Sequence, residues 1–438
     1  MPHSSWLMAN RFNMNEQFLQ YIWKFRLLNP DLRTSGGEKL AVLHPGIQNT
    51  DGGPDFFNAR IRINTNIWAG NVEVHYRSSD WIRHRHQFDP AYENVILHVV
   101  YENDQAIRTK HKEMMPTLIM RNNFPASIEE RYTQIMQNHL WIPCYKLLNG
   151  AGTNVLRLWA PALATERLTA KSGFVLRLLD EYADWDEVLY ILLSSGFGFR
   201  INALPFELLA RSIPLRIVRK NADSLFKLEA LFYGQSGLLC KHPGDKYKRS
   251  LQAEYRHQQA KYNLKPLKPG LWKMLRLHPQ NFPDIRISQL VQCLYNCKAE
   301  PGMLLNITET DKLKDFFRLS ASEYWNRHYR FGRTSGKKEK KIGCGSAGLL
   351  LINILAPFFF AYGSARDFSP LRMRAVELLE SIEGEDNHET RMWQSLGMNA
   401  GNALESQALI QLKRTYCDHK RCLECRIGLK VLDKKPMP

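Results

Sequence analysis

The segment from residue 46 to residue 104 contains three apolar runs whose spacing constrains the fold more than any other feature of the chain. From Phe57 to Asn64, apolar and polar residues alternate, a pattern typical of a strand with one buried face. Residues 67–75 also have strand character, and the run VILHVVY at residues 95–101 is apolar enough for a strand buried on both faces. We therefore expect these three segments to be strands of one sheet.

Carboxylate and imidazole side chains lie at the ends of the first two expected strands. Asp55 opens the first strand, and Glu73 and His75 are two residues apart near the end of the second. Side chains two apart point to the same face of a strand, so pairing of the two strands would bring Asp55 close to both. Such a cluster can hold a divalent cation such as Mg²⁺ or Mn²⁺ for phosphodiester hydrolysis. We therefore identify Asp55, Glu73 and His75 as candidate catalytic residues, with the two carboxylates as metal ligands.

Two further histidines, His84 and His86, follow the second strand in the sequence SSDWIRHRH. In an extended chain both rings would point to one side, which suits a transition metal. The sequence leaves three interpretations open: a second metal site, contact with a scissile phosphate, and a histidine-rich surface loop. The first two make His84 and His86 candidate catalytic residues. His44 and His98 belong to the same expected sheet, and the apolar surroundings of His98 favour a hydrogen-bonded core residue.

The pair Pro54-Asp55 is followed 18 positions later by Glu73-Val74-His75. This motif resembles that of the PD-(D/E)XK nuclease superfamily, and the order of the expected elements resembles its core. Those elements are a helix at 16–28, a strand at 40–44, the strand with Asp55, the strand with Glu73, a short helix at 89–93 and the strand at 95–101. The resemblance implies an N-terminal mixed-sheet, restriction-nuclease-like domain.

The resemblance also implies roles for individual residues. Asp55 and Glu73 would hold Mg²⁺ or Mn²⁺, helped by the main-chain carbonyl of Val74. The lysine that usually ends the motif is histidine here, and His75 would position or deprotonate a water molecule. A glutamate of the first helix sometimes joins the metal site in this superfamily, and Glu16 occupies that position. A first-turn acid stabilised by the helix dipole is the simpler interpretation of Glu16.

The chain as a whole also resembles a bacterial two-domain family of unknown function, domain-of-unknown-function family 2851. The motifs that carry this resemblance are GPDF at residues 53–56, WAGNVEVH at 68–75, SSDWIRHRH at 78–86, NFPDIR at 281–286 and a YC segment followed by CLEC at 416–425. The resemblance extends over nearly the full length and implies no particular activity.

The length of 438 residues exceeds that of a typical single domain. Residues 1–13 lack an apolar core and are expected to be an N-terminal extension rather than a targeting segment. Sheet-type alternation ends near residue 121, and helical spacing dominates beyond residue 127. We therefore expect an α+β or α/β protein with a nuclease-like domain at 14–135 and a mostly α-helical domain at 150–438.

The formal net charge is +17, which favours a polyanionic partner because lysine and arginine release counterions when they neutralise phosphates. Together with the motif, the charge predicts a nucleic-acid partner, DNA or RNA. The longest apolar run, residues 348–362, is shorter than a membrane span of about 20 residues and contains Pro357. We expect it to be a core helix kinked or ended at that proline, and we expect no membrane association.

Eight cysteines without a secretory signal indicate a reducing, cytoplasmic setting. Cys417, Cys422 and Cys425 form a C-x4-C-x2-C pattern with His419 inside it, a spacing suited to Zn²⁺ or an iron–sulfur cluster. Three thiolates do not complete a tetrahedral site, so the fourth ligand would be His419 or Cys344. Reduced structural thiols are the alternative interpretation.

The sequence therefore supports two main hypotheses. The first is a metal-dependent, nuclease-like phosphodiesterase that acts on nucleic acid, in which His84 or His86 neutralises the phosphate or leaving group. The second is a nuclease fold that has lost catalysis and binds DNA or RNA through its charge. A hydrolase of another substrate with a His/Asp metal site is a third possibility.

Overall fold

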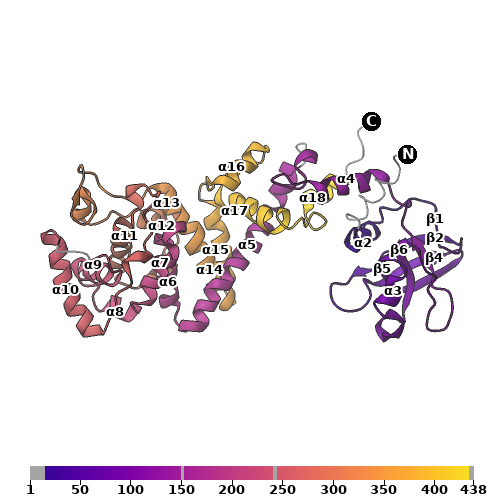
Figure 1. Cartoon of the computed structure of the whole chain (residues 1–438), viewed down its shortest axis with the longest axis horizontal. Helices are drawn as coiled ribbons and strands as arrows, with labels where there is room; N and C mark the ends of the chain where they lie inside the picture. Colours follow the sequence, from indigo (N-terminus) through magenta and orange to yellow (C-terminus); the bar gives the residue numbers. More distant parts are fainter. Residues whose placement is uncertain (1–14, 149–151, 240–243, 434–438) are drawn as a thin grey trace. The chain divides into compact units, whose positions relative to one another are not determined.

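The computed structural model describes residues 15–148, 152–239 and 244–433 (Figure 1). The chain divides into two compact units. The first contains Met1–Arg157 together with Leu412–Pro438, and the second contains Leu158–Gln411. The extension expected at residues 1–13 lies outside the described residues.

The first unit is built on a seven-stranded mixed sheet of order β1-β2-β4-β5-β6-β7, in which β3 pairs with β4. Pairing is antiparallel from β1 to β5 and parallel from β5 to β7. The mixed N-terminal sheet predicted from the sequence is therefore confirmed. The strands are β1 (Leu32–Arg33), β2 (Lys39–His44), β3 (Ile47–Gln48), β4 (Phe56–Ile63), β5 (Asn66–Arg77), β6 (Val95–Glu102) and β7 (Thr117–Ile119).

Strand β4 departs from the predicted alternation at its first residues. Ala59, Ile61 and Ile63 are buried as expected, but Phe56 is buried and Phe57 is only partly covered. The register with β5 shifts between Phe56 and Ala59, and Asn58 has a φ of 57°. The expected parity of Phe57 is thus wrong, because this bulge reverses the side-chain order at the start of the strand.

The parallel pair β5 and β6 forms the centre of the sheet, with Glu73 opposite His98. Parallel strands need a crossover, and here it consists of three short helices: α3 (Asp80–Arg83), η2 (His86–Phe88) and η3 (Pro90–Tyr92). The short helix expected at residues 89–93 corresponds to η3, which Asp89 caps through the amide of Ala91.

Helix α2 (Glu16–Lys24) packs against β5. Its N-cap is Asn15, whose side chain accepts a hydrogen bond from the amide of Phe18 at 3.0 Å. The helix is four residues shorter than the predicted range of 16–28, because Phe25 caps its C-terminus and Arg26 takes a left-handed conformation with φ of 52°. Because α2 packs against β5, its first residue, Glu16, lies beside the sheet.

The first unit is completed by α4 (Ala126–Gln137) and by the C-terminal segment of the chain. That segment comprises the π-helical turn η10 (Leu412–Cys417) and the helix α18 (Arg426–Leu432), and α18 packs against α4. Residues separated by nearly 300 positions in the sequence therefore belong to one core.

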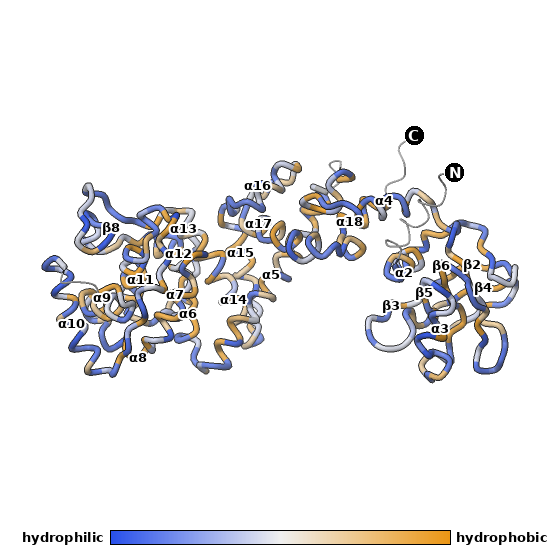
Figure 2. Tube along the Cα trace, viewed as in Figure 1, coloured by the Kyte–Doolittle hydropathy of each residue, from blue (hydrophilic) through white to orange (hydrophobic). Residues whose placement is uncertain are grey.

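The second unit is mostly helical, as the sequence predicts, with one small hairpin of β8 (His328–Arg330) and β9 (Arg333–Thr334). Figure 2 marks the apolar residues along these helices. The helices are α5 (Gly152–Tyr182, which begins in the first unit), α6 (Trp185–Phe197), α7 (Phe199–Arg211), α8 (Leu215–Arg219), α9 (Leu225–Gln235), α10 (Lys246–Tyr262), α11 (Pro283–Asn296), α12 (Thr310–Phe316), α13 (Cys344–Leu350), α14 (Ala356–Ala365), α15 (Ser369–Glu380), α16 (His388–Ser395) and α17 (Ala403–Gln411).

The apolar run around Pro357 belongs to a continuous helical stretch, Cys344–Ala365, that includes the π-helical turn η9 (Leu351–Leu355). Its 22 residues are long and apolar enough to cross a membrane, but 61% of its most apolar window is buried inside the fold. Such burial is typical of a core helix. Pro357 lies in the first turn of α14, directly after the π-helical turn, so the helix continues past it.

Candidate metal centre

The predicted catalytic residues meet at one end of the β4 and β5 strands. Asp55 directly precedes β4, and Glu73 and His75 lie on β5. The amide of Asp55 donates to Glu73 Oε2 at 3.0 Å, and the amide of Val74 donates to Asp55 Oδ2 at 3.0 Å. Each carboxylate is therefore fixed by the main chain of the neighbouring strand, and the expected convergence of Asp55, Glu73 and His75 is present.

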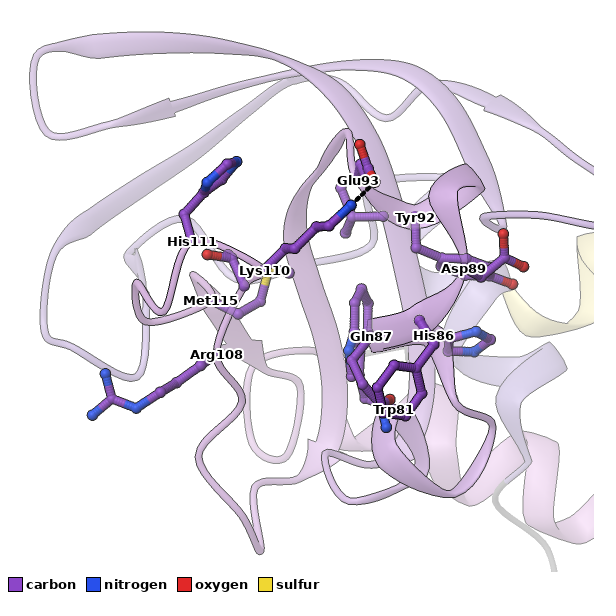
Figure 3. Close-up of a pocket in the computed structure, with 13 residues that line it drawn as sticks. Trp81, His86, Gln87, Asp89, Tyr92, Glu93, Arg108, Lys110, His111 and Met115 are labelled. Atoms are coloured by element: carbon purple, nitrogen blue, oxygen red, sulfur yellow. Dashed lines mark hydrogen bonds and ion pairs between the residues drawn. The ribbon is translucent and has the colours of Figure 1, made fainter.

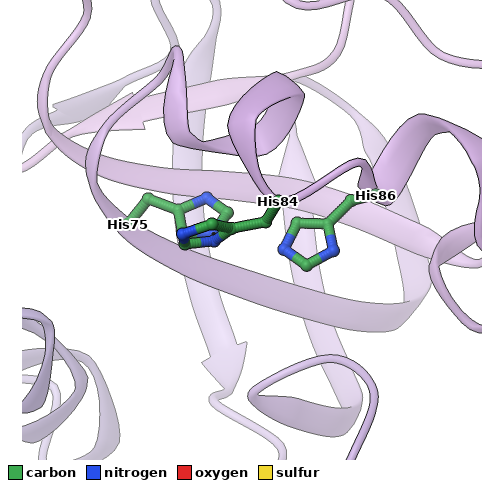
Figure 4. A group of neighbouring side chains, drawn as sticks. All are labelled: His75, His84 and His86. Carbon is green, nitrogen blue, oxygen red and sulfur yellow. The ribbon is translucent and has the colours of Figure 1, made fainter.

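The second oxygen of Glu73 faces a group of imidazoles. Glu73 Oε1 lies 3.3 Å from His75 Nε2 and 3.4 Å from His86 Nε2. His84 Nδ1 lies 3.2 Å from His75 Nε2, and one ring nitrogen of each of the three histidines falls within 4.8 Å of the others (Figure 4). Three ring nitrogens thus surround one point, and Glu73 Oε1 borders two of the rings.

Helix α3 and a tight turn bring His84 and His86 to this point. The chain is not extended there, contrary to the expectation for a His-x-His pair: His84 caps α3, and Arg85 adopts a left-handed conformation with φ of 62°. The start of α3 is held by Asp80, whose Oδ2 accepts the amide of Arg77 at 3.0 Å. The turn at Arg85 aims both rings toward His75.

The imidazole group is supported from behind by the sheet and by the crossover. His75 Nδ1 lies 2.9 Å from His98 Nε2, and His98 is fully buried on β6. This is the hydrogen-bonded core histidine that the sequence predicts. The ring of Tyr92 stacks on His86 with centroids 3.8 Å apart. His44 is exposed, binds the amide of Gly46 and has no contact with the group among the described residues.

Helix α2 contributes two residues to the centre. The carboxylate of Glu16 accepts a hydrogen bond from the main chain of Tyr76 and interacts electrostatically with Asp55, Glu73 and His84. Glu16 therefore faces the centre. The simpler interpretation, an acid that only stabilises the first turn of the helix, does not account for these contacts. The side chain of Gln20 bonds to Asp55. Gln20 was not singled out from the sequence, although its spacing of four from Glu16 puts both on one helix face.

The environment pushes the acidic groups toward their neutral forms. Burial raises the pKa of Asp55 to about 7, and the nearby Glu73 carboxylate adds to this rise. Burial also raises the pKa of Glu73 to about 8, while the hydrogen bond from the Asp55 amide opposes the shift. The pKa of Glu16 is raised by burial as well, against the hydrogen bond from Tyr76.

Burial likewise pushes His75, His86 and His98 toward their neutral forms. Burial lowers the pKa of His75 to about 2, and the neighbouring His98, His86 and His84 rings lower it further. Burial lowers the pKa of His98 to about 3 and also lowers that of His86. A neutral imidazole can bind a cation through a ring nitrogen. The charge of a bound cation would also compensate crowded carboxylates and so favour the loss of their protons.

The donor set fits a divalent ion. His86 Nε2 is buried and makes no hydrogen bond with the described residues, although it lies beside Glu73 Oε1. Glu73, His75 and His86 would supply one oxygen and two nitrogens, a combination suited to transition metals. Glu16, Asp55 and Glu73 would supply the carboxylate oxygens that Mg²⁺ and Mn²⁺ prefer. Glu73 belongs to both sets.

A cavity of about 210 Å³ opens on the other side of His86 (Figure 3). Three residues that line it, Trp81, Gln87 and Thr109, carry buried polar atoms without hydrogen-bond partners among the described residues. The ammonium of Lys110 also lines the cavity and pairs with Glu93 at 2.5 Å. The cavity thus offers polar groups without partners, an aromatic wall and a cation next to the histidine cluster.

The predicted cysteine ligands lie elsewhere in the first unit. Cys422 and Cys425 are buried and Cys417 is partly buried, whereas His419 is exposed. Cys344 is exposed and belongs to the second unit.

The fold and the centre define a class: a protein with a mixed α/β unit that holds a buried carboxylate and imidazole cluster, followed by a helical region. The family described as "Protein of unknown function (DUF2851)" matches residues 16–388, and the chain belongs to this family. The match confirms the family resemblance deduced from the sequence. No curated protein and no solved structure matches the chain.

Proposed function

We propose that this protein is a metal-dependent phosphodiesterase that cleaves nucleic acid. The observation that carries the proposal is the position of Glu73, which binds the amide of Asp55 through one oxygen and meets His75 and His86 through the other. A single carboxylate thus links the acidic and imidazole halves of one cation site.

The resemblance to PD-(D/E)XK nucleases supports the choice of reaction. Asp55 and Glu73 lie on adjacent antiparallel strands, and β5 runs parallel to β6, which agrees with the element order that the resemblance implies. The N–H and C=O of a strand residue point to the same neighbouring strand. Because the amide of Val74 bonds Asp55, its carbonyl is directed toward the same side and is available as a ligand.

The ligands would be Asp55, Glu73 and the Val74 carbonyl, joined by His75 and His86. This mixture of oxygen and nitrogen donors favours Mn²⁺ over Mg²⁺, because imidazole binds transition metals better than it binds Mg²⁺. The ion would supply Lewis acidity at the phosphate and a reactive water at neutral pH.

The protein's own residues would perform the remaining steps. His75 is almost fully buried and neutral, so it cannot provide the permanent charge of the usual lysine. It would instead be a ligand of the ion through Nε2, because Nδ1 contacts His98, and its neighbour His84 is exposed. His84 can therefore exchange protons with solvent and protonate the leaving oxygen. The formal net charge of +17 favours association with the phosphate backbone.

The test is cleavage of single- and double-stranded DNA and RNA by the full-length protein in EDTA, Mg²⁺ or Mn²⁺. We expect cleavage only with a divalent ion, most strongly with Mn²⁺. Asp55→Asn and Glu73→Gln should each lower the rate by roughly 10²–10³-fold, because each removes a carboxylate that would hold the ion that stabilises the transition state. Asp31→Asn, an exposed carboxylate on another loop, serves as the matched control. Cleavage that survives in both centre variants would refute the proposal.

The second candidate function is nucleic-acid binding without cleavage. The observation in its favour is the histidine at the lysine position of the motif, combined with the high positive charge. Salt-sensitive binding without any metal-stimulated cleavage would select this function.

A further inference from the structure

Four cysteines of the first unit gather where the C-terminal segment of the chain meets α4. Cys144 lies in the loop after α4 and precedes the short helix η4 (Tyr145–Leu147). Cys417 ends η10, and Cys422 and Cys425 lie in the turn before α18. The thiols are close enough that Cys417 interacts electrostatically with the other three, and Cys422 interacts with Cys144 and Cys425.

Several contacts fix the two segments against each other. Helix α18 packs against α4. The ammonium of Lys420 donates to the carbonyl oxygen of Met136 at 2.5 Å, and the ammonium of Lys413 lies 5.3 Å from the ring centre of Trp141. Gly428 lies directly over Cys422, since an added Cβ would fall 2.2 Å from the Cys422 carbonyl oxygen. The segment that carries three cysteines is therefore held in place beside the fourth.

We propose that Cys144, Cys417, Cys422 and Cys425 bind one thiophilic metal centre, either a zinc ion or an iron–sulfur cluster. Both centres take four cysteine thiolates, so the ligand chemistry is shared. Cys144 supplies the fourth sulfur that the C-x4-C-x2-C pattern lacks. His419, on the surface, and Cys344, in the other unit, are not needed.

The surroundings of the four thiols suit metal-bound thiolates. Cys144, Cys422 and Cys425 are each less than 8% exposed. The amide of Gly428 points at the sulfur of Cys425 at 3.4 Å, a donor that stabilises a negatively charged sulfur. Lys413 and Lys420 interact electrostatically with Cys417 and Cys422, respectively. Because Lys413 also pairs with Asp418, Lys420 is left to offset part of the net charge of −2 that four thiolates leave on one Zn²⁺ ion.

Burial raises the pKa of Cys144 to about 12 and that of Cys425 to about 11, so the free thiols stay protonated. Metal binding would release these protons to solvent and form four metal–sulfur bonds. The centre would link the C-terminal segment to a loop that lies more than 270 positions earlier in the sequence. It would therefore hold the two parts of the first unit together. This inference is independent of the proposed phosphodiesterase activity.

The test starts with full-length protein purified without oxygen, in which zinc and iron are measured per chain and the absorption spectrum is recorded. We expect about one zinc ion, or about four irons with visible sulfur-to-iron absorption. Cys144→Ser should lower the metal content about tenfold or more. Cys344→Ser, which alters an exposed cysteine of the second unit, should leave it unchanged. His86→Ala, which alters the other centre, should also keep the cysteine-bound metal.

Differential alkylation of the unaltered protein provides a measurement that does not depend on the folding of a variant. In the metal-loaded protein, the four cysteines should be protected, and Cys344 should react at once. Removal of the metal with a chelator should release the C-terminal segment from the loop, so that all four become reactive together. The proposal is overturned if the anaerobic protein contains neither metal in stoichiometric amount, or if Cys144→Ser retains the full content.

Discussion

Asp55 and Glu73 should make the metal-free protein less stable as the pH rises. Their ordinary pKa values are 3.8 and 4.5, and the folded protein raises them to about 7 and about 8. Between the ordinary pKa and the raised pKa of each group, the folded state therefore binds more protons than the unfolded chain. Their contribution to stability is complete below the ordinary values, and it is lost as the pH rises through about 7 and about 8.

This effect can be measured by chemical unfolding in EDTA at pH 6 and pH 8. We expect the free energy of unfolding to fall by on the order of a few kcal/mol across this range. Mn²⁺ should reverse the trend, since it binds the ionised carboxylates. Asp55→Asn and Glu73→Gln should flatten the pH dependence, because an amide oxygen can still accept the main-chain hydrogen bonds without acquiring charge. An equal slope in the variants and the parent protein would contradict this assignment.

Substitution of His98 would test whether the sheet orients the imidazole cluster. Its ring lies behind His75, with Nε2 2.9 Å from His75 Nδ1, so it is a positioning residue. His98→Leu should weaken Mn²⁺ binding by about 10–100-fold, as expected for loss of a partner behind a metal ligand. His44→Leu, at an exposed position of the same sheet, should leave the affinity unchanged. Calorimetric titration would measure both, and equal affinities would rule out the orienting role.

At the scale of single elements, the packing around Gly70 of β5 explains why the WAGNVEVH motif has a glycine at this position. A Cβ at this position would lie 2.5 Å from Ile96 Cγ2 and 2.7 Å from the carbonyl oxygen of Asn94. Neither neighbour can move easily, because Ile96 is buried on β6 and the Asn94 carbonyl accepts a hydrogen bond from the amide of Asn71 at 2.8 Å. The glycine therefore permits the close approach of β5 to the start of β6.

Gly70→Ala should accordingly destabilise the first unit by about 1–3 kcal/mol, the usual cost of overpacking a core. Gly52→Ala is the matched control, since a Cβ there meets nothing within 4 Å. Denaturant unfolding followed by the fluorescence of the tryptophans would give both values. A destabilisation no larger at Gly70 than at Gly52 would show that the strand can shift to accept the methyl group.

The elements differ in how far the sequence could predict them. Periodicity was sufficient for β5 and β6 and for the contact between Asp55 and Glu73, because strand pairing follows from alternation and from the order of elements. The bulge at Asn58 and the left-handed turn at Arg85 were not predicted. Both depend on which backbone shape the neighbouring strands and helices allow, and no local pattern of residue types encodes that choice.

At the scale of the whole molecule, the least predictable feature is the return of Leu412–Pro438 to the first unit. The sequence predicts that this segment belongs to the helical domain at 150–438, because helical spacing dominates beyond residue 127. Membership of a core depends on contacts between distant residues, and periodicity contains no information about them. For the same reason, Cys144 was not connected with the three C-terminal cysteines.

The charge of the whole molecule leads to the prediction that separates binding from cleavage. With a formal net charge of +17, association with nucleic acid should release many counterions. We expect the affinity of the Glu73→Gln variant for duplex DNA or RNA to fall by about 10²–10⁵-fold between 50 and 200 mM salt. Glu73→Gln removes the proposed metal ligand but no positive charge, so its binding in EDTA should match that of the parent protein. Fluorescence anisotropy with a labelled duplex would measure this. Affinity that is insensitive to salt would mean that the positive charge does not contact phosphates, and nucleic acid would then be the wrong substrate for this centre.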